Sequence, residues 1–481
     1  MTEEEELIEL RQRNNLLEEQ VKQIPVLQDL INQLTEQVKQ LQEQVAKNSQ
    51  NSSLPPSSDR FSRQSKSRSL RKRSGKKPGG QAGHQGYTLQ MSAEPTEVIQ
   101  LPKVTHCRHC QMDVSERRVH TIERRQVMDV PAPPPLQVRQ YEAEWKLCPH
   151  CQRYTSAPFP EGVSAPVQYG PRVAAMAVYL MTQQLLPRRR TKEVLVDLLG
   201  ISLSEGTLTT LIKRAARCLV PIEEQIKTAL SQAKVIHQDE TGLYVMGKRV
   251  WMHVTSTRTL THYQVHHSRG HEALDEIGLL AHFDGTSVHD AWAAYFRYGC
   301  LHSLCGVHIL RELRFLSQEL GWWWAAKMER LLLQMKQATE TASAQGQTSL
   351  CASEVQTFQA AFLSLLDEGD GVHPRAPTPT GQRGKAKQHP ARNLLDRLRK
   401  HQDAVLAFLY DLAVPFDNNL AERDVRMVKV QQKVSGTFRS DDGAIFFARL
   451  RGYVSTLRKQ GQPIYPALEA TLRGQPLLPS F

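Results

Sequence analysis

Apolar residues recur at alternating intervals of three and four over the first 47 residues, which predicts a coiled coil at 1–47. A β-branched residue at the a positions with leucine at the d positions favours a parallel dimer. The a positions are Ile24, Ile31, Val38 and Val45, and the d positions are Leu27, Leu34 and Leu41. An earlier apolar run has a different phase, and Pro25 lies between the two runs, so we expect it to kink or interrupt the helix. The alternative is an amphipathic helix that packs on its own chain.

The periodicity disappears over 48–92, where serine, proline, glycine and basic residues replace apolar ones. Nine lysines and arginines lie between Arg60 and Lys77, and such a composition cannot build a core. A run of positive charges can be a solvated linker. It can also bind DNA, because each contact between a cation and a phosphate releases counterions. We predict a disordered linker whose DNA-binding residues are Arg71, Lys72, Arg73, Lys76 and Lys77.

Two CxxC pairs at 93–160 flank Val-rich segments that are expected to form a hairpin over 124–147. Zn²⁺ takes four tetrahedral thiolates in structural sites, and each CxxC turn presents two of them. A redox pair is the alternative, but two such pairs in one short segment favour a zinc ribbon. The predicted zinc ligands are Cys107, Cys110, Cys148 and Cys151, a closed set that leaves no open position for catalysis.

Helical periodicity returns at 161–228, where a "GISLSEG" turn separates one helix from a second that begins near Thr207. This pattern is typical of a helix-turn-helix, although an ordinary helical hairpin has the same spacing. The arginines at 188–190, with Lys213 and Arg214, favour a helical DNA-binding domain.

From residue 234 the apolar period is two, and the expected element order through 317 is β-β-β-α-β-α-β-α. The first strand is expected to end in the acids of "KVIHQDET". A tight turn is expected at Gly247-Lys248, and "AWAAYFRY" is expected to be a helix. That order is the order of a ribonuclease H-like fold, in which the ends of the first and fourth strands are neighbours. Asp239 and Asp290 should then meet and hold Mg²⁺, which prefers oxygen ligands.

A third carboxylate is expected from the stretch "NNLAERDVRMVKV", where Glu422 begins a helix and cations follow. Residues four and seven apart share a helix face, so Arg426 and Lys429 would bind DNA phosphates beside Glu422, with Lys433 further along. The alternative is a capping box in which Asn419 is the N-cap.

Other residues near these motifs have less defined roles. Glu240 should face the opposite side of its strand from Asp239, and Asp424 a different helix face from Glu422. Asp284 precedes a turn, and Asp417 lies before the helix of Glu422. His308 and Arg311 share a helix face and could support the active site, while Cys305 is expected to be a buried thiol.

The composition narrows the class of partner. The 481 residues carry a formal net charge of +12, which favours a polyanionic partner. Nucleic acid is the first candidate for that partner, and an anionic membrane is the second. The first residues are acidic and lack the apolar run of a signal peptide, and no apolar stretch reaches the roughly 20 residues of a membrane span. We therefore expect a cytoplasmic, nucleoid-associated protein whose eight cysteines are metal ligands or buried thiols.

These motifs together resemble the transposases of the insertion-sequence sixty-six family along essentially the whole chain. The resemblance is carried by "KNSQNSSLPPSSD", "GKKPGGQAGHQG", the CxxC pairs, "HQDET", "HDAWAAY", "CGVHILREL" and "NNLAERDVRMVKV". It implies a DDE transposase of a bacterial insertion sequence, with Asp239, Asp290 and Glu422 as catalytic acids and magnesium ligands.

The same resemblance implies a zinc-binding segment and small accessory proteins encoded by the same element. The expected partners are DNA, as element terminal inverted repeats and target, and a second copy in a homodimer or higher oligomer. The expected activity is Mg²⁺-dependent cleavage of element ends followed by strand transfer. A catalytically inactive or domesticated zinc-containing DNA-binding protein is the alternative, and a junction-type nuclease on the same fold would not explain the zipper or the zinc ribbon.

The predicted fold class is multidomain α+β. After the coiled coil, linker and zinc ribbon come a helical helix-turn-helix-like domain and a ribonuclease H-like catalytic domain with a helical insertion. The expected boundaries of these later parts are 161–228 for the helical domain, 229–317 for the first part of the catalytic core, 318–414 for the insertion, 415–460 for the second part of the core and 461–481 for a C-terminal tail.

Overall fold

The computed structural model describes residues 3–46, 89–130, 136–377, 386 and 388–481, and it is a mixed α+β structure with two sheets. The chain forms two compact units, one of residues 1–64 with 159–481 and one of residues 65–158. Within the described residues, no helix has the length and apolar character needed to cross a membrane.

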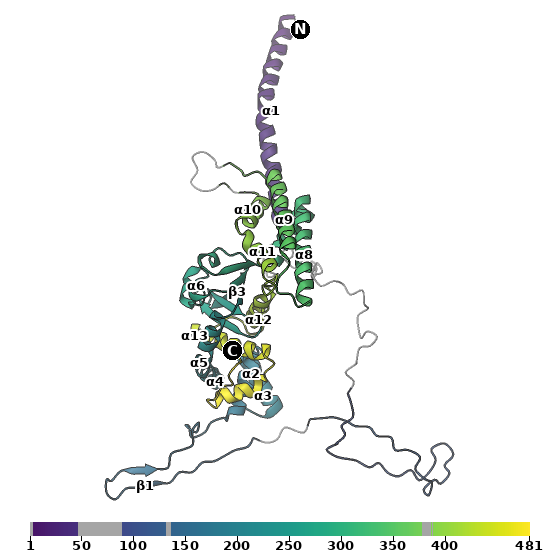
Figure 1. The fold of residues 1–481 in the computed structure, drawn as a ribbon, viewed down its shortest axis with the longest axis vertical. Coiled ribbons are helices and arrows are strands. Elements are labelled where there is room, and N and C mark those ends of the chain that lie inside the picture. Colours follow the sequence, from purple (N-terminus) through teal and green to yellow (C-terminus); the bar gives the residue numbers. More distant parts are fainter. Residues whose placement is uncertain (1–2, 47–88, 131–135, 378–385, 387) are drawn as a thin grey trace. The chain divides into compact units, whose positions relative to one another are not determined.

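The N-terminal helix α1 spans Glu3–Ala46 with Pro25 inside it (Figure 1). The expected interruption at Pro25 is therefore wrong: a proline removes one backbone donor, and the turns on either side remain helical. The a and d side chains from Ile24 to Val45 are all exposed on the single chain, which does not support packing on the chain's own core. Dimerisation through this apolar stripe stays a prediction.

The predicted basic DNA-binding residues between 71 and 77 lie outside the described residues, and 89–92 are exposed without regular structure. In the unit of residues 65–158, both CxxC pairs form the same turn. The N–H of Gln111 donates to the carbonyl of Cys107 at 2.9 Å, and that of Gln152 to Cys148 at 2.9 Å. Both glutamines have a left-handed backbone, with φ of 61° and 53°.

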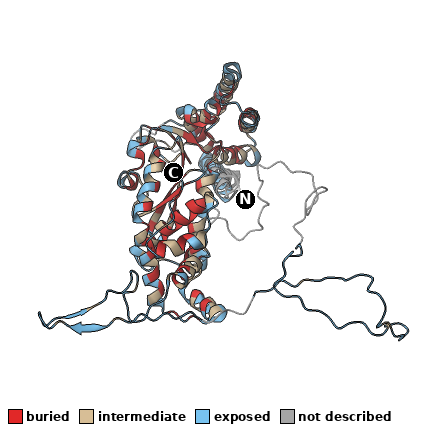
Figure 2. Ribbon diagram, turned by 60° about the horizontal axis from the view of Figure 1, so that its bottom comes forward, coloured by how far each residue is buried: buried red, intermediate tan, exposed pale blue. Residues whose placement is uncertain are grey.

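A two-stranded antiparallel sheet flanks the second turn, with β1 at Trp145–Leu147 and β2 at Tyr154–Ser156. The hairpin expected over 124–147 is wrong for the residues that the structure describes there, because only its last three residues are in a strand. Both strands are largely exposed (Figure 2).

Four helices follow in the larger unit: α2 Pro171–Thr182, α3 Arg188–Leu199, α4 Glu205–Cys218 and α5 Val220–Ser231. The turn between α3 and α4 is as expected, since Gly200 ends α3 with φ of 65° and the Ser204 side chain accepts from the N–H of Thr207. The Ser204 cap makes α4 begin at Glu205, two residues earlier than predicted. Arg214 is exposed and donates one hydrogen bond to the carbonyl of Leu472; its binding to DNA stays a prediction.

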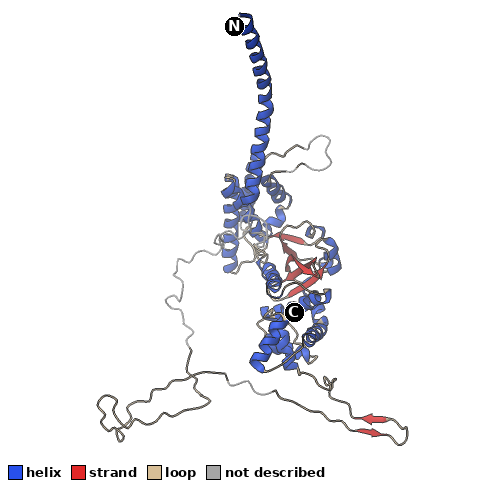
Figure 3. Ribbon diagram, turned by 180° about the vertical axis from the view of Figure 1, so that it is seen from behind, coloured by secondary structure: helices blue, strands red, loops and turns tan. Residues whose placement is uncertain are grey.

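A five-stranded sheet forms the centre of this unit, with helices around it (Figure 3). Its strands lie in the order β5-β4-β3-β6-β7, with the first three antiparallel and β3, β6 and β7 parallel. They are β3 Val235–Val245, β4 Lys248–Ser256, β5 Thr261–His266, β6 Thr286–His289 and β7 Leu301–Leu304. The predicted neighbourhood of the first and fourth strands is confirmed, because β3 pairs with β6.

Three local expectations for this region are wrong. The strand β3 does not end at its acids but continues to Val245, because β4 pairs with it along its whole second half. The turn is at Met246-Gly247, where both residues have positive φ. The stretch "AWAAYFRY" contains a single 3-10 turn at Tyr295–Arg297 instead of a helix.

Helices complete the larger unit. They are α6 His271–Ile277, α7 Gly306–Arg314, α8 Trp323–Ala344, α9 Ala352–Val372, α10 Pro390–Lys400, α11 Gln402–Tyr410, α12 Asn419–Ser435, α13 Asp441–Lys459 and α14 Ile464–Leu472. Short 3-10 and π turns lie at Leu280–His282 and Phe315–Glu319. The helical content expected at 318–414 is confirmed, and much of its basic loop, 378–385 and 387, is outside the described residues.

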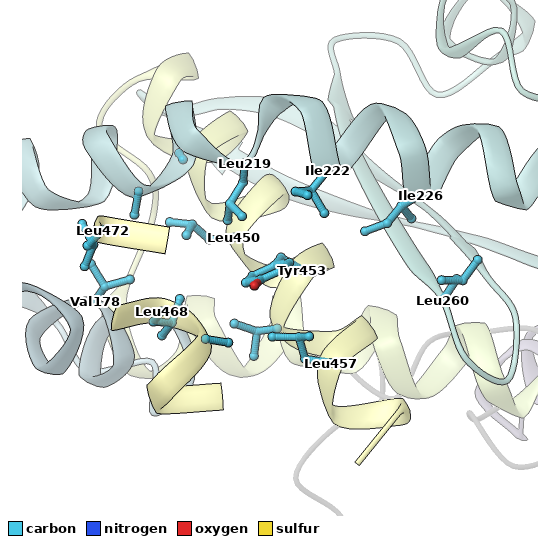
Figure 4. Packing of buried hydrophobic residues seen from close by; sticks show 14 of the residues in the cluster. Val178, Leu219, Ile222, Ile226, Leu260, Leu450, Tyr453, Leu457, Leu468 and Leu472 are labelled. Carbon is cyan, nitrogen blue, oxygen red and sulfur yellow. The ribbon is translucent and has the colours of Figure 1, made fainter. Parts of the chain in front are cut away.

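One apolar core joins the helical segment to the end of the chain. Figure 4 shows Tyr453 of α13 among aliphatic side chains that include Ile222 of α5 and Leu468 of α14. The segment 461–481, expected to be a C-terminal tail, contains α14, which packs on α2 and α4 with Ala467, Leu468 and Leu472 buried. Its apolar positions belong to a core that is shared with α13 and with α2, α4 and α5, which lie more than 200 residues earlier in the chain.

Candidate active site

The strand register places two of the predicted acids side by side. His237 of β3 pairs with Val288 of β6, and Asp239 and Asp290 each lie two residues beyond that pair. Each carboxylate is oriented by a nearby backbone N–H: that of Glu240 donates to Asp239 Oδ1 at 2.9 Å, and that of Trp292 to Asp290 Oδ1 at 3.1 Å.

The third acid, Glu422, lies in the first turn of α12, and α12 packs on β3 and β4. Asn418, buried just before this helix, connects it to β3. Its Nδ2 donates to the Gln238 carbonyl at 2.7 Å, and its Oδ1 accepts from His237 Nδ1 at 3.0 Å. These bonds hold the start of α12 against the residue that precedes Asp239.

The capping-box interpretation of Glu422 is wrong. The residue before α12 is Asn418 instead of Asn419, and its side chain makes no cap hydrogen bond because it is bound to β3. The Oε1 atom of Glu422 is buried and has no hydrogen-bond partner among the described residues. Glu422 therefore has an unused oxygen in the site.

Electrostatics link the three acids. Burial raises the pKa of Asp239 well above its ordinary value, and the charges of Glu240, Asp290 and Glu422 raise it further. The charges of Asp290 and Glu422 thus act on Asp239, although in the described residues the oxygens of the three acids do not all lie within 4.8 Å of one another. Their convergence on one metal ion stays a prediction. A divalent cation among them would remove that repulsion, and carboxylate oxygens are ligands that Mg²⁺ accepts.

Residues 166–445, more than half of the chain, match the Transposase IS66 family. The chain belongs to the IS66 family of transposases. Residues 4–90 match a family of unknown function (DUF6444). A comparison with curated proteins found no match.

Glu240 has a different role in this IS66-family chain from its neighbour Asp239. Its Oε1 accepts from Arg269 Nε at 2.8 Å, and its Oε2 accepts from the Tyr295 hydroxyl at 2.6 Å. The Arg269 guanidinium stacks on Trp292, 3.4 Å from the ring centroid, and on Trp251. Glu240 therefore joins β3 to the segment that follows Asp290, a link that reasoning from strand alternation alone missed.

That segment has an unusual backbone. Ala291 has φ of 71°, in the left-handed region that a residue with a Cβ rarely occupies. The N–H of Ala291 donates to His289 Nδ1 at 3.2 Å, which helps to hold this conformation. A residue in such a conformation is found where the surrounding contacts impose it, and here it turns the chain sharply at Asp290.

The remaining acids have other surroundings. Asp284 is exposed and precedes β6, at the opposite end of that strand from Asp290. Asp424 is buried and accepts from Ser256, Thr261 and Lys459. Asp417 accepts from the N–H of Asn419 at 3.1 Å. None of these arrangements includes Asp239.

The cations of α12 divide into two groups. Arg426 and Lys433 are exposed, as expected for residues that contact DNA. Lys429 instead donates its ammonium to the carbonyl of Gly242 on β3, and burial followed by the charge of Arg249 lowers its pKa. Lys429 is thus half-buried against β3, unlike the two exposed cations, and its binding to DNA stays a prediction.

Two further residues on α7 were predicted to support the site. His308 Nδ1 lies 3.9 Å from Glu422 Oε1, so it reaches the candidate site. Burial lowers the pKa of His308, the charge of Glu422 opposes that effect, and the charge of Arg311 adds to it. Arg311 is partly buried on the same helix.

The zinc-ligand prediction has a local basis. The backbone N–H of Cys110 lowers the pKa of the Cys107 thiol, and that of Cys151 lowers the pKa of Cys148, which favours the thiolate form that binds metal. The four sulfurs do not form a single cluster in the described residues. One shared zinc ion stays a prediction.

Proposed function

We propose that this chain is a DNA transposase that cleaves the ends of its element and joins the freed 3′-hydroxyl to target DNA by a DDE mechanism. The observation that carries the proposal is the approach of Asp290 and Glu422 to Asp239 from a neighbouring strand and from a helix 132 residues further along the chain.

The strand order supports a ribonuclease H-like assignment for the catalytic part. Three antiparallel strands are followed by two parallel ones, and the first acid lies on the central strand β3. Because one fold supports several activities, the strand order alone does not identify the reaction.

The donor set fits Mg²⁺. Burial and the charges of Glu240, Asp290 and Glu422 raise the pKa of Asp239. A cation beside Asp239 would offset that repulsion, and the unpartnered Glu422 Oε1 offers a ligand oxygen. Asp239, Asp290 and Glu422 would hold the ion, which in phosphoryl transfer stabilises the attacking and leaving oxygens. The protein's own contribution is orientation: Asn418 holds α12 to β3, and Glu240 with Arg269 holds the segment after Asp290.

DNA binding is proposed to use other residues. Arg426 and Lys433 extend from the site along the exposed face of α12, and the basic segment around residue 71 would add phosphate contacts. Zinc binding by the four CxxC cysteines would order the segment between Cys107 and Cys151. Binding and cleavage should therefore be separable by substitution.

The test is an in vitro cleavage assay on DNA that carries the inverted repeats flanking the gene, in Mg²⁺ buffer. Asp239→Asn, Asp290→Asn and Glu422→Gln should each reduce cleavage by at least about 1000-fold, because loss of a metal ligand costs several kcal/mol of transition-state stabilisation. DNA affinity should change little. Asp284→Asn is the control, since Asp284 is exposed at the far end of β6.

Two outcomes would contradict the proposal. Normal cleavage by Glu422→Gln would remove Glu422 from the mechanism. Tight DNA binding by the wild-type chain without cleavage at any Mg²⁺ concentration would support the non-catalytic DNA-binding alternative instead.

A further inference from the structure

A second set of possible metal ligands lies beside the three acids. The Sγ of Cys305, a ring nitrogen of His308 and a carboxylate oxygen of Glu422 all lie within 4.8 Å of one another. In the part of the chain that the structure describes, no other three histidine, cysteine or acidic residues meet this criterion. Cys305 directly precedes α7, and His308 and Glu422 lie in the first turns of α7 and α12.

The backbone around the three residues is tightly constrained. The N–H of Cys305 donates to the carbonyl of His289 at 2.9 Å, and the N–H of Gly306 donates to the carbonyl of Phe416 at 2.8 Å. A Cβ at Gly306 would lie 2.3 Å from the Phe416 ring, so only glycine allows α7 to approach the segment before α12 this closely. The approach brings the starts of both helices together.

Two polar atoms in this group lack partners. His308 Nδ1 and Glu422 Oε1 are both buried and make no hydrogen bond among the described residues. Their separation of 3.9 Å is too long for a hydrogen bond. Leaving such atoms unsatisfied costs free energy, and a bound ion would satisfy both.

The donor chemistry differs from that of the three carboxylates. Thiolate and imidazole are ligands of Zn²⁺ and similar ions, whereas Mg²⁺ prefers oxygen. Three protein ligands of this mixed type leave a fourth position for water or another group. The thiol proton would pass to solvent when the sulfur binds the ion.

We propose that Cys305, His308 and Glu422 form a binding site for a zinc-type transition-metal dication, and that this ion competes with Mg²⁺ for Glu422. The binding half of the proposal stands on the geometry alone. The competition half rests on the proposed function, because it assumes that Glu422 also serves the three-carboxylate site.

The binding test uses Co²⁺ as a spectroscopic probe of thiolate coordination, without DNA. Co²⁺ is titrated into the full-length chain in which the four CxxC cysteines are changed to serine, so that these cysteines do not contribute to Co²⁺ binding. Cys305→Ala in that background should weaken binding by at least about 100-fold, since even residues outside the ligand shell contribute 10- to 100-fold. Cys300→Ala is the matched control, because Cys300 is also a buried thiol but lies outside the group.

Equal Co²⁺ affinity in Cys305→Ala and Cys300→Ala, or no Co²⁺–thiolate absorption in either, would overturn the site. His308→Gln provides a second variant if Cys305→Ala does not fold, and it should weaken binding similarly.

The competition half is tested by adding Zn²⁺ to the wild-type cleavage assay in Mg²⁺. Zn²⁺ should inhibit the wild type at lower concentration than Cys305→Ala, and equal sensitivity would overturn competition. A wild-type chain that binds Co²⁺ but never cleaves DNA would contradict the proposed function alone.

Discussion

Removal of the Glu240 side chain should destabilise the catalytic unit more than removal of an exposed acid. The side chain of Glu240 is 2% exposed, and both of its oxygens accept hydrogen bonds. Glu240→Ala would leave the Arg269 guanidinium without its carboxylate and the buried Tyr295 hydroxyl without an acceptor.

The magnitude follows from those two losses. Breaking a buried pair costs about 3–5 kcal/mol, and the lower end applies because Arg269 is 39% exposed and keeps its stacking on Trp292. An unpaired buried hydroxyl adds about 1–3 kcal/mol. The expected loss for Glu240→Ala is therefore roughly 4–6 kcal/mol. Glu240→Gln keeps the shape and one acceptor, so it should cost about 1–2 kcal/mol.

The assay is denaturant unfolding followed by tryptophan fluorescence, because Trp251 and Trp292 contact Arg269 and report on this region. Glu272→Ala is the control: Glu272 is exposed on α6, and its loss should change stability by no more than about 0.5 kcal/mol. If Glu240→Ala is as stable as Glu272→Ala, the assignment of Glu240 as a link between β3 and the Asp290 segment is refuted.

Three further predictions concern the metals and the N-terminal helix. Metal analysis of chelator-free protein should find about one structural zinc per chain bound by Cys107, Cys110, Cys148 and Cys151, and its absence would contradict the zinc ribbon. A peptide of residues 1–47 should show helicity that rises with concentration, and polar substitution of Leu27 and Leu34 should abolish this rise; a monomeric unstructured peptide would argue against the dimer. Because the folded-state pKa of Asp239 is raised above 3.8, the folded state binds its proton more tightly, so its contribution to stability is greatest near pH 4 and falls as pH rises through the folded pKa. Melting temperatures from pH 4 to 8 should show that Mg²⁺ offsets this fall in the wild type and not in Asp239→Asn, and identical profiles would refute the charge repulsion.

Local patterns in the sequence were sufficient for features that depend on neighbouring residues. The heptads predicted α1, the "GISLSEG" turn predicted the break between α3 and α4, and alternation predicted the strands around Asp239 and Asp290. These features follow from backbone periodicity, which a short window of sequence contains. Glu422 was the candidate third acid because it begins a helix in which cations follow, and the family motifs agree with that choice. Its role stays a prediction, because periodicity alone does not connect it to the two aspartates.

Tertiary structure decided which partner each of these side chains has. Asn418 and Asn419 are the same residue type at adjacent positions, yet the buried one bonds to His237, 181 residues earlier in the chain, and so cannot cap α12. Lys429 and Lys433 lie on one helix, but only Lys429 reaches a β3 carbonyl. The meeting of Cys305 and His308 with Glu422 likewise requires the close approach of two helices at Gly306. Such contacts depend on packing between segments more than 100 residues apart, and no local pattern records which segments the folded chain brings together.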